Sequence, residues 1–184
     1  MTDSIRQPDT PFGKVTTFGD VLLELDSSVG WVQSVQWSPA GTKLAFVGHD
    51  SSFSVADVSS GKGNVESVKY TDLPFRDLLW ITEDSVVAVG HDCTPVLFQN
   101  KGGWKFVKKV DEGKAAAATG NASARQIFQS KVDKGEETVV ETNLNTKHQN
   151  CITWIAPYKK AGNAVSQFST SGVDGNLAVW DAKF

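Results

Sequence analysis

Short apolar runs separated by small and polar residues dominate the chain. Residues 31–37 alternate between apolar and polar side chains, which is typical of a strand with one buried face. Residues 44–47 form a continuous apolar run, as expected for a strand that is buried on both faces. Ser, Pro, Ala and Gly at residues 38–41 predict a turn between the two strands.

The same order of apolar runs recurs twice further along the chain. The corresponding runs are residues 78–81, 86–89 and 96–98 in a second unit, and 152–155, 165–169 and 177–180 in a third. Residues 104–107 alternate and predict an outer strand of the second unit. Four short strands in about 40 residues correspond to one blade of a β-propeller.

A Gly-x-Asp tripeptide marks each unit: Gly48-His49-Asp50, Gly90-His91-Asp92 and Gly172-Val173-Asp174. The glycines lie 42 and then 82 residues apart, and the first spacing matches the ~40–45 residue period of WD repeats. The third unit ends on Trp180-Asp181, the WD dipeptide itself. We therefore predict an all-β fold, a partial WD40 β-propeller over residues 11–184 with blades near 30–70, 75–110 and 148–184.

The longer second spacing indicates one long insert, at residues 111–147, because this segment has few strand-forming residues and no Gly-x-Asp turn. Ser123 and Gln126 are spaced as in a capping box. Ala124, Ile127, Phe128 and Val132 then fall on one face of a short helix, so the insert is predicted to contain a helix. The residues alone leave open whether this face packs on the propeller or enters a groove of a partner.

The aspartates Asp50, Asp92 and Asp174 are expected to accept backbone N–H bonds and hold the turn between the second and third strands. His148 lies in the loop that leads into the third unit, so this unit can join Asp174 and Trp180 in one hydrogen-bonded network. The first two units have Ala56 and Phe98 in place of the tryptophan, and we expect their blades to depend more on packing.

The His-Asp pairs also allow a catalytic hypothesis, since a histidine beside an aspartate can act as a base and histidines with Cys93 and Cys151 can bind a metal. The pairs recur at the repeat spacing, which favours a structural cause. The sequence also lacks the hydrolase, zinc-protease and phosphate-loop motifs. We predict no enzymatic activity, no catalytic residue, no cofactor and no metal.

The net charge, the N-terminal residues and the cysteines limit the expected partners and cellular compartments further. The net charge of −3 gives no reason to expect nucleic acid as a partner, although residues 101–147 carry an excess of positive charge. Residues 1–10 are polar and predicted to be disordered, without an apolar signal core. No run approaches the ~20 apolar residues of a membrane span, and two cysteines without a framework suit a reducing compartment.

Several stretches resemble the propeller subunit, subunit 1, of the actin-related protein 2/3 (Arp2/3) complex, in its C-terminal half. They include Pro11-Phe12-Gly13 before Gly30-Trp31-Val32, residues 75–80, and residues 167–175 with Trp180-Asp181. The most specific is residues 88–98, because ordinary WD repeats do not share its Cys-Thr-Pro-Val-Leu-Phe ending. The resemblance covers about residues 11–184.

This resemblance implies about three to four blades of a seven-bladed disc, and a scaffold subunit that supports actin nucleation and branched filament assembly. The implied partners are the other subunits, including actin-related proteins, and the actin filament, in the cytoplasm at actin patches. It also implies that the insert contacts actin through Arg125, Ile127 and Phe128. The alternative is a generic WD40 adaptor that binds another peptide or protein.

Three blades cannot close a propeller, which needs about 4–8. The strand at residues 177–181 would then keep an open edge, and open edges aggregate. We therefore predict that the chain alone is poorly soluble or oligomeric and recovers when mixed with an N-terminal propeller half; a sharp monomer peak would contradict this.

Overall fold

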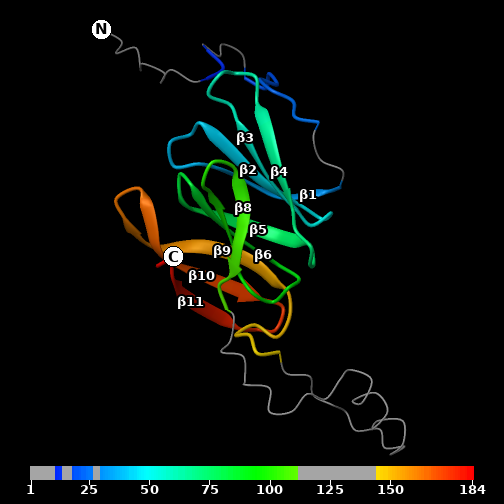
Figure 1. Cartoon of the computed structure of the whole chain (residues 1–184), viewed down its shortest axis with the longest axis vertical. Coiled ribbons are helices and arrows are strands. Elements are labelled where there is room, and N and C mark those ends of the chain that lie inside the picture. The colour runs from blue at the N-terminus through cyan, green and yellow to red at the C-terminus, as the bar shows by residue number, and fades with distance from the viewer. Residues whose placement is uncertain (1–10, 14–17, 27–29, 112–143) are drawn as a thin grey trace, which may run out of the picture.

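The computed structural model describes residues 11–13, 18–26, 30–111 and 144–184, which form eleven strands in three antiparallel sheets (Figure 1). The first sheet contains β1 (Val32–Trp37), β2 (Lys43–Gly48), β3 (Ser52–Asp57) and β4 (Asn64–Lys69). The second contains β5 (Phe75–Thr82), β6 (Ser85–Gly90), β7 (Val96–Asn100) and β8 (Trp104–Lys109). The third contains β9 (Ile152–Ala161), β10 (Ala164–Gly172) and β11 (Leu177–Asp181).

Each sheet consists of consecutive strands in chain order, so every strand pairs with the next through a hairpin. This is the up-and-down order of a propeller blade. The predicted all-β, partial WD40 propeller is confirmed, and the three sheets do not close into a ring. The predicted helix of the insert lies outside the described residues, as do residues 1–10.

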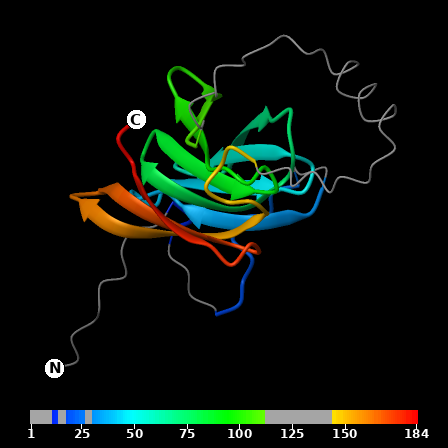
Figure 2. The same cartoon turned by 90° about the horizontal axis from the view of Figure 1, so that it is seen from below.

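The three sheets stack with their first strands side by side. β1 contacts β5, and β5 contacts β9, while β4 at the far edge of the first sheet contacts β8. The second sheet therefore lies between the other two (Figure 1). The longest strands, β9 and β10, form a hairpin that extends beyond the neighbouring sheets (Figure 2).

The interface between the first and second sheets is rich in aromatic side chains. Phe53 stacks on Phe98 with ring centroids 4.4 Å apart, and Trp80 meets Trp104 edge-on at 5.6 Å. Complete burial of such a side chain contributes about 1.5–3 kcal/mol. The Trp80 Nε1–H also donates to the backbone carbonyl of Gln36 on β1 at 3.0 Å, which ties the two inner strands together.

The interface between the second and third sheets is aliphatic. Leu79, Val87 and Leu97 face Ile155 and Phe168, and all five are buried. Since alternate residues of β6 enter one interface or the other, this strand is buried along its whole length. The continuous apolar run at residues 86–89 predicted that this strand is buried on both faces.

The two outermost sheet faces keep exposed apolar side chains. On the first sheet Phe12, Leu23 and Leu25 cover part of the outer face. Trp37 on the same sheet remains 49% exposed. On the third sheet the exposed side chains include Trp154, which is 65% exposed. The stack thus ends on two partly uncovered faces.

Candidate functional site

The three Gly-x-Asp tripeptides occupy the same place in the three sheets. Each forms the turn between the second and third strand, joining β2 to β3, β6 to β7, and β10 to β11. The turns lie at one end of the stack. Their aspartates are bound differently in each sheet.

In the first sheet Asp50 accepts two bonds from Ser52, one from its backbone N–H at 3.2 Å and one from its hydroxyl at 2.6 Å. Lys69, the last residue of β4, lies 3.4 Å from the same carboxylate. Burial acts to raise the pKa of Asp50, but the bonds from Ser52 and Lys69 outweigh it and hold the pKa below its ordinary value. The turn is therefore stabilised by a charged aspartate.

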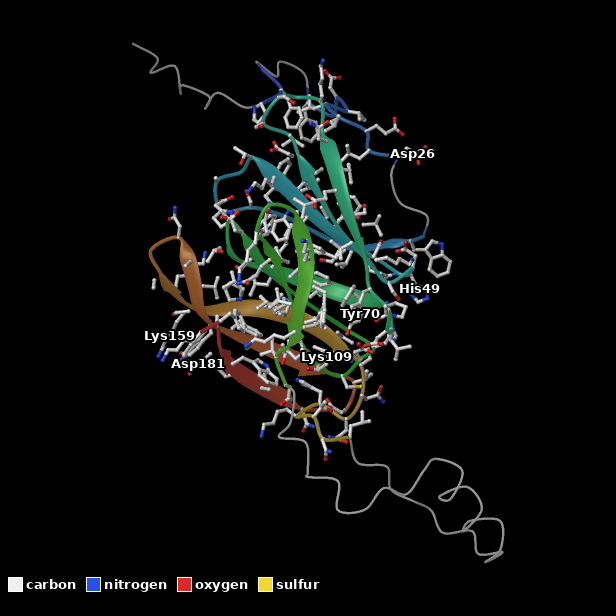
Figure 3. All side chains as sticks on the ribbon, viewed as in Figure 1. Asp26, His49, Tyr70, Lys109, Lys159 and Asp181 are labelled. Atoms are coloured by element: carbon white, nitrogen blue, oxygen red, sulfur yellow. The ribbon has the colours of Figure 1, made fainter. Side chains whose placement is uncertain are left out.

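In the second sheet Asp92 accepts from the Tyr70 hydroxyl at 2.7 Å and from the Leu73 N–H at 3.2 Å. Tyr70 and Lys109 are labelled in Figure 3 and lie near one another in that view. Lys109, the last residue of β8, lies 3.4 Å from Asp92 and 2.8 Å from Asp72. Burial of the Tyr70 ring and its bond to Asp92 raise the pKa of the phenol well above its ordinary value. This network joins the turn to the connection from the first sheet.

In the third sheet the carboxylate of Asp174 holds the turn from both sides. It accepts the backbone N–H of Gln149 at 2.8 Å and that of Asn176 at 3.0 Å. The His148 Nδ1 lies 3.2 Å from both carboxylate oxygens. Burial acts to raise the pKa of Asp174, yet these donors lower it to about 2.

A chain of side-chain hydrogen bonds continues from His148 into the sheet. Its Nε2 lies 2.8 Å from the Thr170 hydroxyl, and the Trp180 Nε1–H donates to that hydroxyl at 2.8 Å. Because a carboxylate only accepts, the imidazole proton is on Nδ1, facing Asp174, and in this neutral tautomer the Thr170 hydroxyl donates to Nε2. The fully buried His148 thus has one donor and one acceptor, both used.

Glycine is required at the first position of each turn, because the aspartate folds back over it in the first and third sheets and neighbouring backbone crowds it in the second. A Cβ on Gly172 would lie 2.7 Å from an Asp174 carboxylate oxygen, and one on Gly48 would lie 2.4 Å from Asp50. At Gly90 the nearest atom is the Pro74 carbonyl oxygen at 2.3 Å. Cβ atoms in proteins essentially never approach other heavy atoms this closely, so the steric exclusion of a Cβ explains why glycine recurs at this position.

The middle residues of the turns are more accessible than the aspartates. His49 stacks on Trp31, with centroids 5.7 Å apart, and meets His91 at 6.2 Å. Trp31 is 76% exposed and Val173 is 64% exposed. The turn end of the stack therefore exposes aromatic and apolar side chains.

The insert joins the stack at this same end. Val110 N–H donates to Pro95, just after the second turn, and Lys147 N–H donates to the Asp111 carboxylate. The two ends of the insert are therefore held together beside His148. Arg125, Ile127 and Phe128 lie outside the described residues.

A concave surface lies where strands β1, β5 and β9 meet. A cavity of about 340 Å³ is lined by Trp37, Trp80, Pro157 and Lys160, among others. Sequence reasoning did not find this cavity, because its walls come from three different sheets.

The described residues contain no group of three or more histidine, cysteine, aspartate or glutamate side chains placed to hold a metal. Cys93 and Cys151 are free thiols, and burial raises the pKa of both. Raised thiol pKa values disfavour the reactive thiolate. Within the described parts of the chain there is also no helix long and apolar enough to cross a membrane.

Sequence comparisons place the chain among known proteins. No family model matches it. It is 38% identical over 182 residues to actin-related protein 2/3 complex subunit 1A-B of Xenopus laevis, covering 97% of this chain and 49% of that protein. Subunit 1A of Arabidopsis thaliana is 37% identical over 175 residues (90% and 46%), and subunit 1 of Schizosaccharomyces pombe is 33% identical over 189 residues (92% and 50%). The chain spans about half the length of the curated relatives it matches.

Proposed function

The chain is a homologue of subunit 1 of the Arp2/3 complex along nearly its whole length, and we propose that it acts as a non-catalytic scaffold subunit of such a complex. The observation that carries this proposal is the identity of 33–38% across all three sheets. The relatives are named as subunits of one assembly. We infer that residues 30–70, 75–110 and 148–184 are three blades of its propeller.

The hydrogen bonding of the turns supports a role in holding partners. Within the described residues no buried side-chain nitrogen or oxygen lacks a hydrogen-bond partner. Asp174, His148 and Thr170 use their polar atoms on one another. A catalytic group needs an atom free to meet a substrate, whereas a rigid scaffold needs satisfied groups.

The insert is proposed to reach the actin filament. Its two ends are joined at the turn end of the stack, so the segment between them leaves from one place. Arg125 with the apolar pair Ile127 and Phe128 would form the contact, and such an amphipathic helix gains most of its stability from the groove it enters. The proposed location is the cytoplasmic actin cytoskeleton, including actin patches.

The test of the scaffold role is capture of partners from a lysate of the source cells with the tagged full chain, followed by mass spectrometry. We expect actin-related proteins and the other subunits of the complex. Recovery of a different, reproducible set of proteins without actin-related proteins would contradict the proposal and favour a generic WD40 adaptor.

The insert is tested separately, with Ile127→Ala and Phe128→Ala combined. We expect the captured subunits to remain while cosedimentation of the assembled complex with actin filaments falls, by about tenfold for the loss of two apolar anchors. Val107→Ala, an exposed apolar residue on β8, is the matched control and should change neither. Unchanged cosedimentation in the double variant would contradict the actin contact.

A further inference from the structure

The residue two positions after the turn aspartate has a different partner in the second sheet. In the first and third sheets this residue, Ser52 or Asn176, donates from its side chain to the aspartate of its own turn, at 2.6 and 3.0 Å. The equivalent Thr94 is buried, and its hydroxyl accepts the backbone N–H of Asp111 at 3.3 Å. Thr94 also belongs to the Cys-Thr-Pro-Val-Leu-Phe stretch that ordinary WD repeats do not share. The second turn therefore holds the residue at which the insert begins.

The segment that follows the insert is folded onto one side chain. The Gln149 amide oxygen accepts the Leu144 N–H at 2.8 Å, and the amide nitrogen donates to the Leu144 and Thr146 carbonyls at 2.9 and 2.6 Å. The Gln149 backbone N–H donates to Asp174 at 2.8 Å. Residues 144–149 are thereby fixed to the turn of the third sheet.

Asp111 connects these two anchored ends. Its carboxylate accepts the backbone N–H of Lys147. A charged acceptor makes a stronger hydrogen bond than a neutral one. Through Thr94 on one side and Gln149 on the other, this bond links the second turn to the third, and the chain enters and leaves the insert at one place.

We propose that Asp111 and Gln149 are positioning residues for the partner contact of the insert. They hold the two ends of the insert in one arrangement before the partner is met. This role rests on the proposed contact of the insert with actin, and it assigns neither residue to the contact itself.

The expected effect follows from the order of residues 144–147. While the bonds hold, these residues are ordered in the free protein, so binding does not have to order them. Without the bonds, binding must order them, which lowers the affinity. The reach of the insert changes little, because the end-to-end distance of a chain grows only with the square root of its length. The net value of one hydrogen bond corresponds to about fivefold in affinity, and we expect a loss of about this size.

The test compares Asp111→Ala and Gln149→Ala in the assembled complex. Amide hydrogen exchange should become faster at Lys147 in the first variant and at Leu144 in the second, because each N–H loses its acceptor. Cosedimentation of each variant complex with actin filaments should weaken by about fivefold.

Two matched controls remove the same kinds of side chain far from the insert. Asp84→Ala lies in the turn between β5 and β6, and Gln99→Ala lies near the end of β7, both toward the opposite end of the second sheet. Neither should change the exchange of residues 144–147 or the cosedimentation. The set of captured subunits should be the same in all four variants, and loss of subunits from the Asp111 or Gln149 variant alone would indicate a purely structural role and overturn the proposal.

The double variant Ile127→Ala with Phe128→Ala, measured alongside, separates this proposal from the actin contact on which it rests. Unchanged exchange, or faster exchange with full cosedimentation, would overturn the positioning role even if the double variant binds weakly. Weaker cosedimentation of the Asp111 and Gln149 variants with normal binding of the double variant would support the positioning role and show that the contact residues are wrongly assigned.

Discussion

Replacement of Thr170 by valine tests the hydrogen-bonded chain in the third sheet most directly. Valine has nearly the same shape but lacks the hydroxyl that accepts from Trp180 and donates to His148. Both partners lose their bond at once. The loss of stability comes from polar atoms left without a hydrogen-bond partner, because the packed volume changes little.

The expected loss follows from the burial of the two partners. His148 is fully buried, so an unsatisfied Nε2 costs about 1–3 kcal/mol. Trp180 is only partly buried and its Nε1–H can recover part of its bond from water, so it adds about 1 kcal/mol. We expect Thr170→Val to reduce the free energy of unfolding by about 2–4 kcal/mol.

The assay is urea unfolding followed by tryptophan fluorescence, with the slope required to match that of the unmodified chain. Thr153→Val on β9 is the control, since Thr153 is exposed and its hydroxyl makes a longer bond of 3.3 Å; it should change stability by less than about 0.5 kcal/mol. A second comparison adds Trp180→Phe, which should cost less in the Thr170→Val background than alone. Equal losses from the two threonine variants, or strict additivity with Trp180→Phe, would refute the chain of bonds.

Two further predictions concern the turns. Because the folded pKa of Asp174 is lowered from 3.8 to about 2, its charged form contributes about 1–2 kcal/mol to the free energy of unfolding above pH 4, and this contribution is lost as the pH falls toward 2. Urea midpoints measured across this pH range should therefore decline less in Asp174→Asn than in the unmodified chain. An identical decline in both proteins would contradict this prediction. Gly90→Ala should lower the free energy of unfolding by about 1–3 kcal/mol in the same urea assay, because a Cβ there meets the backbone of Pro74 and Phe75. Unchanged stability would contradict this and show that the turn shifts to accommodate the Cβ.

The strands and their order were accessible from the sequence because both depend on local patterns. The continuous apolar run of β6 and the alternation of β1 follow from which faces each strand buries. The Gly-x-Asp turns were recognisable because the steric demand for glycine repeats with the sheet unit. His148, Asp174 and Trp180 could be grouped because the Gly-x-Asp turn and the WD dipeptide identify their positions within the repeat unit.

Other residues of the same turns were missed. Thr170 links His148 to Trp180, but a threonine inside a strand carries no distinctive signal. Lys69 and Lys109 reach the turn aspartates from the last position of β4 and β8. Their spacing of about one repeat was a signal that could have identified them.

The chain's own pattern of glycines, aspartates and apolar runs determined that three similar sheets form, since each strand and turn depends on residues close in sequence. Only the tertiary structure decided which side chains meet between sheets, how Asp50, Asp92 and Asp174 are each bound, and which faces stay uncovered. The contacts between sheets join residues about 40 or more positions apart, such as Trp80 with Gln36, or Asp77 with Ile155. The bonds of the three aspartates join residues that are close in the fold but up to 26 positions apart in sequence. Local periodicity carries no information about the distance or direction of such contacts.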